Sequence, residues 1–406
     1  MTMKNLLFPL FLFALLLSSC STKQERYVVI VSLDGFRWDY CKMYNTPFLD
    51  SIAMVGVSGR MRPSYPSKTF PNHYTIATGL VPDHHGIIAN RFIDRVSGRQ
   101  FSLSTPETKY DAYFYHGEPI WVTSQLQGIK AATVYWPGSD VPIKDIYPSV
   151  YHKYSDSLLR HEERIQEVVR LLSLPESERP HLVMCYFEEP DHTGHMFDPQ
   201  SQETSDMIEH LDSLMCQFYC ELSKLDIFDD VNFIVTSDHG MTSVSSERMI
   251  RLSDYLCPEW IENVDYSIPT MLDAVSEDRD GVMVNYADSI IDRLKNVPHI
   301  YVWRRDEVPD SLQFGSNANI GEIIIDSEPG WLVDEKETIY KGAHGFNPFH
   351  LDMQVPFFAI GPQFKQSYHK SDIFQNTAIY PLLCRLLNIE PAPVDGHIEE
   401  VEDFLR

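Results

Sequence analysis

The chain has 406 residues, of which 43% are hydrophobic and 22% are charged, and this composition excludes a disordered or fibrous protein. A chain of this length buries about three-quarters of the surface that its unfolded form exposes. Its 58 acidic and 33 basic residues give a formal net charge of -25. This charge argues against a protein that wraps DNA or RNA, because such binding needs a net electrostatic attraction. A small anionic substrate held by a bound metal ion stays compatible with it.

The N-terminus has the features of a targeting segment. Lys4 precedes an apolar run that extends to Leu17, which is too short to span a bilayer comfortably as a helix. Two serines and Cys20 follow, and small residues before a cysteine are typical of a bacterial lipoprotein cleavage site. The alternative is an ordinary secretory signal with an incidental cysteine. We predict a lipoprotein signal peptide over 1–19, a tether over 20–26, and an exported protein that contacts the membrane of the bacterial envelope only through a lipidated Cys20.

Short apolar runs rich in β-branched and aromatic residues predict buried strands, which in chain order are Tyr27–Leu33, Ala131–Trp136, Leu182–Phe187, Val231–Thr236, Glu322–Asp326 and Pro356–Ile360. Helical patterns between them predict helices at about Thr46–Val55, Pro71–Thr78, Glu162–Leu172, Glu203–Leu225 and Asp372–Leu387. This alternation predicts an α/β fold with a mainly parallel central sheet. Many turn signals from about 252 to 342 indicate an insertion lobe on one domain. The acidic C-terminal tail, 394–406, is expected at the periphery.

Acidic residues follow three of the predicted strands at the point where each strand ends. The first is Asp34, the second is Asp191 with His195 four residues later, and the third is Asp238 directly before His239. Ligand sites gather at the carboxyl ends of strands in an open parallel sheet, so we expect these residues to meet there. A single aspartate after a strand is usually a turn former. Three such residues, two of them accompanied by histidine, favour a functional site.

This combination of residue types points to a metal ion. Clustered carboxylates stay ionised together only when a cation compensates their charge. Ligand sets that mix imidazole and carboxylate suit Zn²⁺, whereas purely oxygen sites suggest magnesium or calcium. His344 is a further candidate ligand, because the glycines on either side of it allow its backbone to approach a site closely. Most of the 16 histidines must be non-ligands, and we assign His73, His84, His85 and His192 to that class.

Thr69 is the candidate nucleophile. Pro71 fits the first turn of a helix, so Thr69 lies at the positive end of that helix, where free N–H groups favour a phosphoryl oxygen. A hydroxyl in this position is ordinarily an N-cap. Coordination to zinc would instead lower its pKa and make it a nucleophile. The side-chain amide of Asn90 is able to donate a hydrogen bond to a phosphoryl oxygen.

The motifs LDG, KTFPNHYTIATGLVPDHHGIIAN, WPGSD, EEPDHTGH, SDHGM and AHGF occur in this order. The ordered set resembles the nucleotide pyrophosphatase/phosphodiesterase family of the alkaline phosphatase superfamily, in a bacterial lipoprotein form. The resemblance extends from about Tyr27 to Pro393 and implies a catalytic domain over 27–393. It also implies an alkaline-phosphatase-like three-layer αβα sandwich that carries the insertion lobe.

The resemblance implies two zinc ions and a nucleotide site. One zinc ion is expected at Asp191, His195 and His344, and the other at Asp34, Asp238, His239 and Thr69. Asn90 is expected to bind a phosphate oxygen. The positions at which family members hold the nucleotide base correspond to Phe70, Leu103, Tyr154 and Tyr186, with Trp136 and Asp140 nearby. A lysine that the family carries after the position of Leu103 has no secure counterpart, because Thr108 occupies its place and Lys109 adjoins it.

The implied reaction is hydrolysis of nucleotide phosphoanhydrides or phosphodiesters to nucleoside 5′-monophosphates. It passes through a covalent intermediate on Thr69 in two in-line steps, with net retention at phosphorus. The implied partners are small nucleotides: nucleoside triphosphates, dinucleotides and nucleotide sugars.

Three other enzyme classes and a non-enzymatic binding protein are the alternatives to this activity. A phosphomonoesterase of the superfamily usually adds an arginine or a third metal ion, and no such arginine is identified here. A lysophospholipid or choline phosphodiesterase stays open, because lipid-cleaving members exist with and without a segment that corresponds to Gly117–Trp136. A non-enzymatic surface binding protein would not need Thr69 and six metal ligands. A sulfatase is disfavoured, because the chain has no Cys-x-Pro-x-Arg motif.

Overall fold

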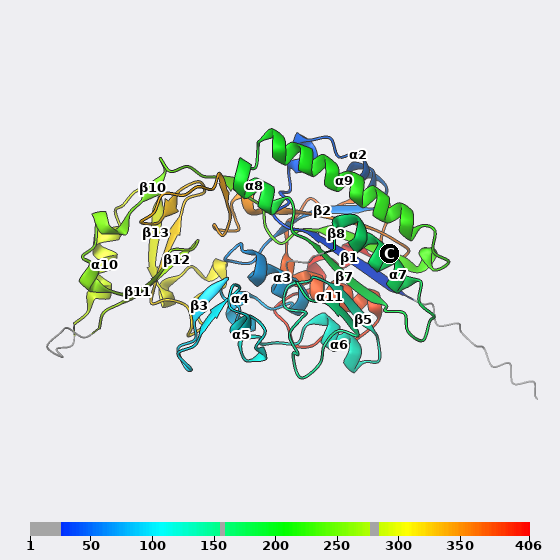
Figure 1. Ribbon diagram of the computed structural model, residues 1–406, viewed down its shortest axis with the longest axis horizontal. Helices are drawn as coiled ribbons and strands as arrows, with labels where there is room; N and C mark the ends of the chain where they lie inside the picture. The colour runs from blue at the N-terminus through cyan, green and yellow to red at the C-terminus, as the bar shows by residue number, and fades with distance from the viewer. Residues whose placement is uncertain (1–25, 155–158, 277–283) are drawn as a thin grey trace, which may run out of the picture.

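The computed structural model describes residues 26–154, 159–276 and 284–406. The predicted signal peptide and Cys20 lie outside these residues. Figure 1 shows a large body of helices and strands with a smaller, β-rich lobe beside it. No helix in the described part of the chain is both long and apolar enough to cross a membrane.

The large body is built around a nine-stranded sheet with the order β18-β2-β17-β8-β1-β7-β5-β6, in which β19 also pairs with β2. Its strands are β1 (Tyr27–Leu33), β2 (Val57–Arg62), β5 (Ala131–Val134), β6 (Val150–His152), β7 (Leu182–Phe187), β8 (Val231–Thr236), β17 (Val355–Ile360), β18 (Tyr368–His369) and β19 (Phe374–Gln375). β1 pairs in parallel with both β7 and β8, and only β17 runs antiparallel to its neighbours. The prediction of a mainly parallel central sheet is confirmed.

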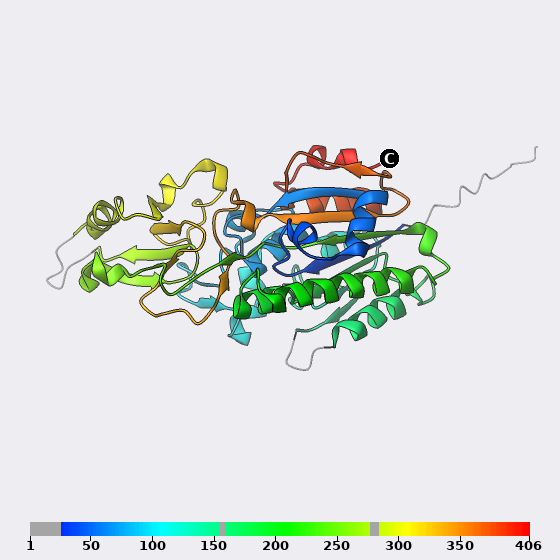
Figure 2. The ribbon, with the colours of Figure 1, turned by 90° about the horizontal axis from the view of Figure 1, so that it is seen from above.

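Helices cover both faces of this sheet, as Figure 2 shows from above. One face carries α2 (Pro47–Val55), α7 (His161–Leu172) and α9 (Gln202–Leu222), and the other carries α3 (Thr69–Thr78), α6 (Ile120–Leu126) and α11 (Ile379–Leu387). Side chains of β1 alternate between the two cores: Val28 and Ile30 pack on the α3 side, and Val29 and Val31 pack on the α9 side. The three-layer αβα arrangement is confirmed.

The lobe has an antiparallel sheet and a hydrophobic core of its own. Its strands, in the order β11-β12-β14-β13, are β11 (Ile261–Asp265), β12 (Thr270–Ala274), β14 (Ile323–Ser327) and β13 (Ile300–Arg304), and α10 (Tyr286–Leu294) packs against them. All of these elements fall within the expected insertion, 252–342. The strand predicted at Glu322–Asp326 therefore belongs to the lobe and not to the central sheet.

Short elements connect the main ones: α1 (Tyr40–Met43), α4 (Pro82–His85), α5 (Pro106–Lys109), α8 (Asp191–Phe197), β3 (Arg91–Ile93), β4 (Gln100–Ser102), β9 (Thr242–Ser243), β10 (Met249–Ile250), β15 (Leu332–Val333) and β16 (Gly342–Ala343). Two of them serve the site. α8 begins where β7 has just ended, and β16 pairs with β9 and packs against α8.

Two expectations for the C-terminal part of the chain are wrong. The helix predicted at Asp372–Leu387 begins only at Ile379, because β19 and a 3-10 turn come before it. The acidic tail is not peripheral, since Val401 and Phe404 are fully buried and the Phe404 ring stacks on Phe357 with 5.0 Å between centroids. Two short 3-10 turns adjoin these two apolar residues, and Asp403 between them pairs with Lys370 at 2.7 Å.

Candidate active site

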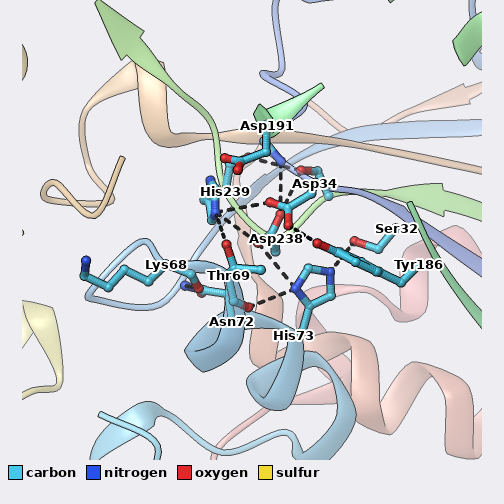
Figure 3. A network of polar contacts seen from close by, with 12 residues as sticks. Ser32, Asp34, Lys68, Thr69, Asn72, His73, Tyr186, Asp191, Asp238 and His239 are labelled. Carbon is cyan, nitrogen blue, oxygen red and sulfur yellow. Dashed lines mark hydrogen bonds and ion pairs between the residues drawn. The ribbon is translucent and has the colours of Figure 1, made fainter. Parts of the chain in front are cut away.

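The carboxyl ends of three neighbouring strands bring three aspartates together, as Figure 3 shows. β1 lies between β7 and β8, and these strands lead to Asp34, Asp191 and Asp238 respectively. The backbone N–H of Asp191 donates to the carbonyl of Asp34 at 3.0 Å. Gly35 makes this approach possible: its φ is +70°, and a Cβ there would lie 2.9 Å from the Asp191 Cα.

The first group of metal-ligand atoms comes from α8 and from the turn after β16. Its members are Asp191, His195 and His344, whose ligand atoms all lie within 4.8 Å of one another. Nε2 of His195 is 3.4 Å, and Nε2 of His344 is 3.6 Å, from the Asp191 Oδ1 atom. A histidine far along the chain thus joins an Asp-x-x-x-His pair on one short helix, as the resemblance implies.

The second group lies deeper, at the ends of β1 and β8. It consists of Asp34, Asp238 and His239, again with all ligand atoms within 4.8 Å of one another. Nε2 of His239 is 3.3 Å from the Asp34 Oδ1 atom and 3.1 Å from the Asp238 Oδ2 atom. All three side chains are nearly inaccessible to solvent. The rings of His239 and His344 stack with centroids 3.6 Å apart, so the two groups adjoin each other.

Backbone carbonyls orient all three histidines in the same way. The Nδ1 atoms of His195, His239 and His344 lie 2.7, 2.8 and 2.9 Å from the carbonyl oxygens of Gly342, Gly240 and Ser67. A carbonyl only accepts, so each Nδ1 carries the proton and each Nε2 keeps its lone pair. Metal-ligating histidines are held in this manner, with the second ring nitrogen bonded to a carbonyl or carboxylate.

The electrostatics of the two groups fit bound cations. Asp34 Oδ1, Asp191 Oδ1 and Asp238 Oδ2 are buried and accept no hydrogen bond from the described residues. Burial raises the pKa of each of these carboxyls well above its usual range, and repulsion from a neighbouring aspartate adds to the rise. Burial also lowers the pKa of His239 and His344 well below the usual value. Orphaned carboxylate oxygens beside neutral imidazole nitrogens fit a zinc ion in each group.

Thr69 is the first residue of α3, and its side chain faces the second group. The hydroxyl lies 3.1 Å from His239 Nε2 and does not cap the helix. The first N–H groups of α3 have no partner within the helix, and they give this end of the helix a partial positive charge. The arrangement places a hydroxyl and a positive helix end next to a potential metal ion.

His73 supports Thr69 from behind and belongs to neither ligand group. Its Nδ1–H donates to the Thr69 carbonyl at 2.8 Å, and its Nε2 accepts from the Ser32 hydroxyl at 2.8 Å. Burial lowers the pKa of His73 to about 3, so its ring is neutral. Trp136, which is 1% exposed, donates its indole N–H to the His73 carbonyl at 3.2 Å. The Trp136 side chain thus braces α3 from the protein interior.

Tyr186 makes a contact that the sequence analysis missed. Its hydroxyl donates to Asp34 Oδ2 at 2.6 Å, and its ring meets His73 edge-on with centroids 5.0 Å apart. Figure 3 shows this hydroxyl directed at the aspartate cluster. The sequence feature that could have predicted this contact is the position of Tyr186 on β7, where it pairs with Ser32 near the end of β1.

Some of the other residues expected around the nucleotide base lie close to one another. The Tyr154 ring lies 6.1 Å from the Tyr186 ring, and Lys109 Nζ lies 5.8 Å from the Phe70 ring and 5.6 Å from the Tyr154 ring. Leu103 is half-buried and packs against the core on the α3 side. Lys109, which the sequence left without a role, therefore stands among the aromatic side chains. We call Phe70, Lys109, Tyr154 and Tyr186 the aromatic slot.

Asp140 and Asn90 complete the set of expected residues. Burial raises the pKa of Asp140, and the positive charge of Lys109 opposes that rise. The two side chains therefore interact electrostatically. The Asn90 side-chain oxygen is buried and accepts no hydrogen bond from the described residues. Asn90 directly precedes β3, and its carbonyl accepts from the Leu103 N–H at 3.2 Å.

Comparison with known proteins assigns the family. Residues 28–347 match the family described as type I phosphodiesterase / nucleotide pyrophosphatase. The chain belongs to this family of hydrolases. It is 34% identical to human ectonucleotide pyrophosphatase/phosphodiesterase family member 5, over 100% of this chain and 84% of that protein. It is 36% identical to human family member 1, over 93% of this chain but only 42% of that longer protein.

The fold comparison agrees with this assignment. The structure of murine family member 5 superposes with a TM-score of 0.87 and 32% identity, covering 94% of this chain and 100% of that one. The alkaline-phosphatase-like architecture implied by the motifs is therefore confirmed for this family member.

Proposed function

We propose that the protein hydrolyses phosphodiester and phosphoanhydride bonds of nucleotides and releases nucleoside 5′-monophosphates. The observation that carries this proposal is the Thr69 hydroxyl, which lies 3.1 Å from Nε2 of His239 in the second of two adjoining metal-ligand groups. Relatives support the substrate class, because they are named for nucleotide pyrophosphatase and phosphodiesterase activity. A threonine-to-alanine variant of murine family member 5 is described as inactive and holds AMP.

The ligand groups would hold two zinc ions. Asp191, His195 and His344 would bind one, and Asp34, Asp238, His239 and Thr69 would bind the other. Bound zinc supplies positive charge that lowers the pKa of a coordinated hydroxyl and offsets the negative charge of the phosphoryl group.

The chain itself supplies the nucleophile and part of the oxyanion binding. Thr69 attacks phosphorus in line and takes the nucleotidyl group onto its Oγ1 atom, while the leaving group departs from the opposite side. The N-terminal N–H groups of α3 and the Asn90 amide donate to the phosphoryl oxygens. Water then attacks phosphorus in a second in-line step, the bond from phosphorus to Thr69 Oγ1 breaks, and a proton from the water restores the Thr69 hydroxyl, so the configuration at phosphorus is retained.

The aromatic slot supplies the binding site for the base. Phe70 and Tyr154 offer ring faces on which a base stacks, and stacking of this kind is worth about 1–3 kcal/mol per base. The Lys109 ammonium lies among these rings, where it pairs electrostatically with Asp140 and is placed to contact an anionic part of the substrate.

The proposal also includes export of the protein. The N-terminal segment would direct the protein across the membrane, and a lipid on Cys20 would retain it in the envelope. Replacing Cys20 with alanine should release active protein into the soluble fraction, as activity assays on separated membranes would show.

Steady-state kinetics on four substrate classes test the proposed activity. We expect kcat/KM for a nucleoside triphosphate and a dinucleotide to exceed that for a phosphomonoester by at least about a hundredfold. Glycerophosphocholine serves as the competing substrate, since a lipid-headgroup phosphodiesterase shares the same metal ligands. A higher kcat/KM for glycerophosphocholine than for both nucleotides would overturn the nucleotide assignment.

A further inference from the structure

A pocket of about 480 Å³ lies on the α2 face of the central sheet and contains none of the metal-ligand residues. Its floor consists of β2 and β17, where Ser58 and Phe358 are 6% and 7% exposed. Asp50 and Ala53 of the nine-residue helix α2 line the pocket, together with Trp38 from the loop that follows Asp34. Sites for small organic ligands typically measure about 300–1,000 Å³. The pocket is therefore large enough for such a molecule.

Three cationic side chains line this pocket, although the whole chain carries a formal charge of -25. They are Lys42, Arg60 and Lys370, against one lining carboxylate, Asp50. Lys370 pairs with Asp403 at 2.7 Å. In the part of the chain that the structure describes, Lys42 and Arg60 form no ion pair with a carboxylate.

Lys42 and Arg60 both contact the indole ring of Trp38. Lys42 Nζ lies 4.4 Å, and the Arg60 guanidinium carbon lies 4.6 Å, from the centroid of this ring. Cationic side chains around the rim of a pocket raise the local concentration of anions, because the low-dielectric walls of the pocket focus their field. A guanidinium and an ammonium that line one pocket suit a phosphate, since the planar guanidinium donates two parallel hydrogen bonds and the ammonium adds a point charge.

We propose that this pocket binds a small organic molecule that carries a phosphate group. The phosphate lies between Lys42 and Arg60, and the apolar part of the molecule lies on Pro356 and Phe358. The size of the pocket favours an organic phosphate over the free ion, which would leave these apolar side chains without a partner. The site is independent of the proposed catalytic reaction, because neither Thr69 nor a metal ligand lines it.

Labelling of the zinc-loaded protein with pyridoxal 5′-phosphate tests this assignment. The probe combines a phosphate with an aromatic ring, and its aldehyde condenses with an unprotonated lysine amine with loss of water. Borohydride then reduces the imine to a stable amine, which peptide mass spectrometry locates. We expect Lys42 to be modified at least about tenfold faster than Lys336, which is exposed and lies outside the pocket. AMP should protect Lys42 at a lower concentration than inorganic phosphate does.

Two arginines on one strand provide a matched pair of variants. Arg60→Gln should lower the modification of Lys42 to the rate seen at Lys336. Arg62→Gln should change nothing, because Arg62 lies two residues further along β2, over the Phe349 ring and outside the pocket. Both variants should keep the nucleotide turnover of the wild type. If melting shows that Arg60→Gln is unfolded, Lys370→Gln takes its place, with the same reduction expected at Lys42.

Three results would overturn the assignment: equal labelling of Lys42 and Lys336, no protection by AMP, or identical behaviour of Arg60→Gln and Arg62→Gln in a folded protein. Protection by inorganic phosphate at the same concentration as AMP would overturn the organic part of the ligand.

Discussion

The two metal-ligand groups and the aromatic slot meet at Tyr186, but the structure holds their side chains in different ways. Each ligand histidine is bonded to a backbone carbonyl, and the ligands of the second group are nearly inaccessible to solvent. In the slot, Tyr154 is 36% exposed and its ring lies about 6 Å from its aromatic neighbour. Hydrogen bonds to backbone carbonyls thus orient the ligand histidines, whereas the slot combines the buried rings of Phe70 and Tyr186 with the exposed ring of Tyr154. Changes in the first region should alter kcat and zinc content, and changes in the second should alter substrate preference.

The largest effect is expected from Thr69→Ala, which removes the nucleophile and leaves the six aspartate and histidine ligands in place. Turnover should fall by at least about a thousandfold, as it does when other nucleophilic enzymes lose their nucleophile. Thr69→Ser should retain part of the rate. Steady-state assays with elemental analysis of each variant check this, and zinc content should stay unchanged. Retention of most activity by Thr69→Ala would mean that water attacks phosphorus directly.

Removal of zinc tests the two metal-ligand groups themselves. Protein purified without chelator should contain two zinc ions per chain, and a chelator should abolish turnover.

In the zinc-free protein, the folded state keeps protons on Asp34, Asp191 and Asp238, because their pKa values are raised. The unfolded state releases these protons above about pH 4. The free energy of unfolding of the zinc-free protein should therefore fall as the pH rises from about 4.

Melting temperatures of both forms across pH 5 to 8 measure this difference. The zinc-loaded form should show the smaller fall, because the metal compensates the ionised carboxylates. A zinc ratio near one per chain, or magnesium alone, would contradict the two-ion site.

Tyr186→Phe tests the residue that the two regions share. The change removes the hydrogen bond to Asp34 and keeps the ring, so it separates metal positioning from base stacking. Loss of a hydrogen bond to a metal ligand typically costs about 10–100-fold in metal affinity or activity. We expect kcat to fall and zinc affinity, measured by chelator competition, to weaken, with little change in the KM for a nucleotide. Tyr154→Phe is the matched control and should leave zinc affinity unchanged.

Tyr154→Ala should produce a smaller and more selective effect. It is a cleaner probe of the slot than Phe70, which is 6% exposed and directly follows Thr69. Loss of stacking should raise the KM for nucleotides by about tenfold, in line with about 1–3 kcal/mol per stacked base. A small aryl phosphodiester without a base should be cleaved as before. An unchanged nucleotide KM in a folded variant would remove Tyr154 from the slot and strengthen the lipid-headgroup alternative.

The smallest effect concerns the contact between the lobe and the segment before Thr69. The Tyr65 hydroxyl donates to Asp326 on β14 at 3.1 Å, and burial raises the pKa of Asp326 to about 7. Folded protein keeps this proton between about pH 4 and 7 while unfolded protein releases it, so Asp326 destabilises the fold increasingly as the pH rises through that range. Asp326→Asn should raise the melting temperature at pH 8 and change it little at pH 4. Equal shifts at both pH values would contradict the assignment of this pKa.

Local sequence patterns predicted much of the fold. The strands at Tyr27–Leu33, Leu182–Phe187 and Val231–Thr236 lie where the apolar runs place them, because both faces of the central strands are covered and their sequences are continuously apolar. The same patterns failed for β2, whose sequence VSGRMR contains two arginines, because only one of its faces packs in the main core. They also failed for the tail, where two isolated apolar residues are buried through short 3-10 turns.

The sequence by itself determined the family and predicted the residues that we propose as metal ligands and nucleophile, because these predictions depend on residue types in a fixed order along the chain. Only the tertiary structure decided which atoms of these residues face one another. The hydrogen bond from Tyr186 to Asp34, the carbonyl that orients His195 and the place of Lys109 among the aromatic rings all join segments distant in sequence. Such contacts arise from the packing of strands and helices, and no local pattern of side chains records them. The cationic pocket beside Trp38 has the same origin, since α1, β2 and the residue directly after β18 each contribute one of its charges.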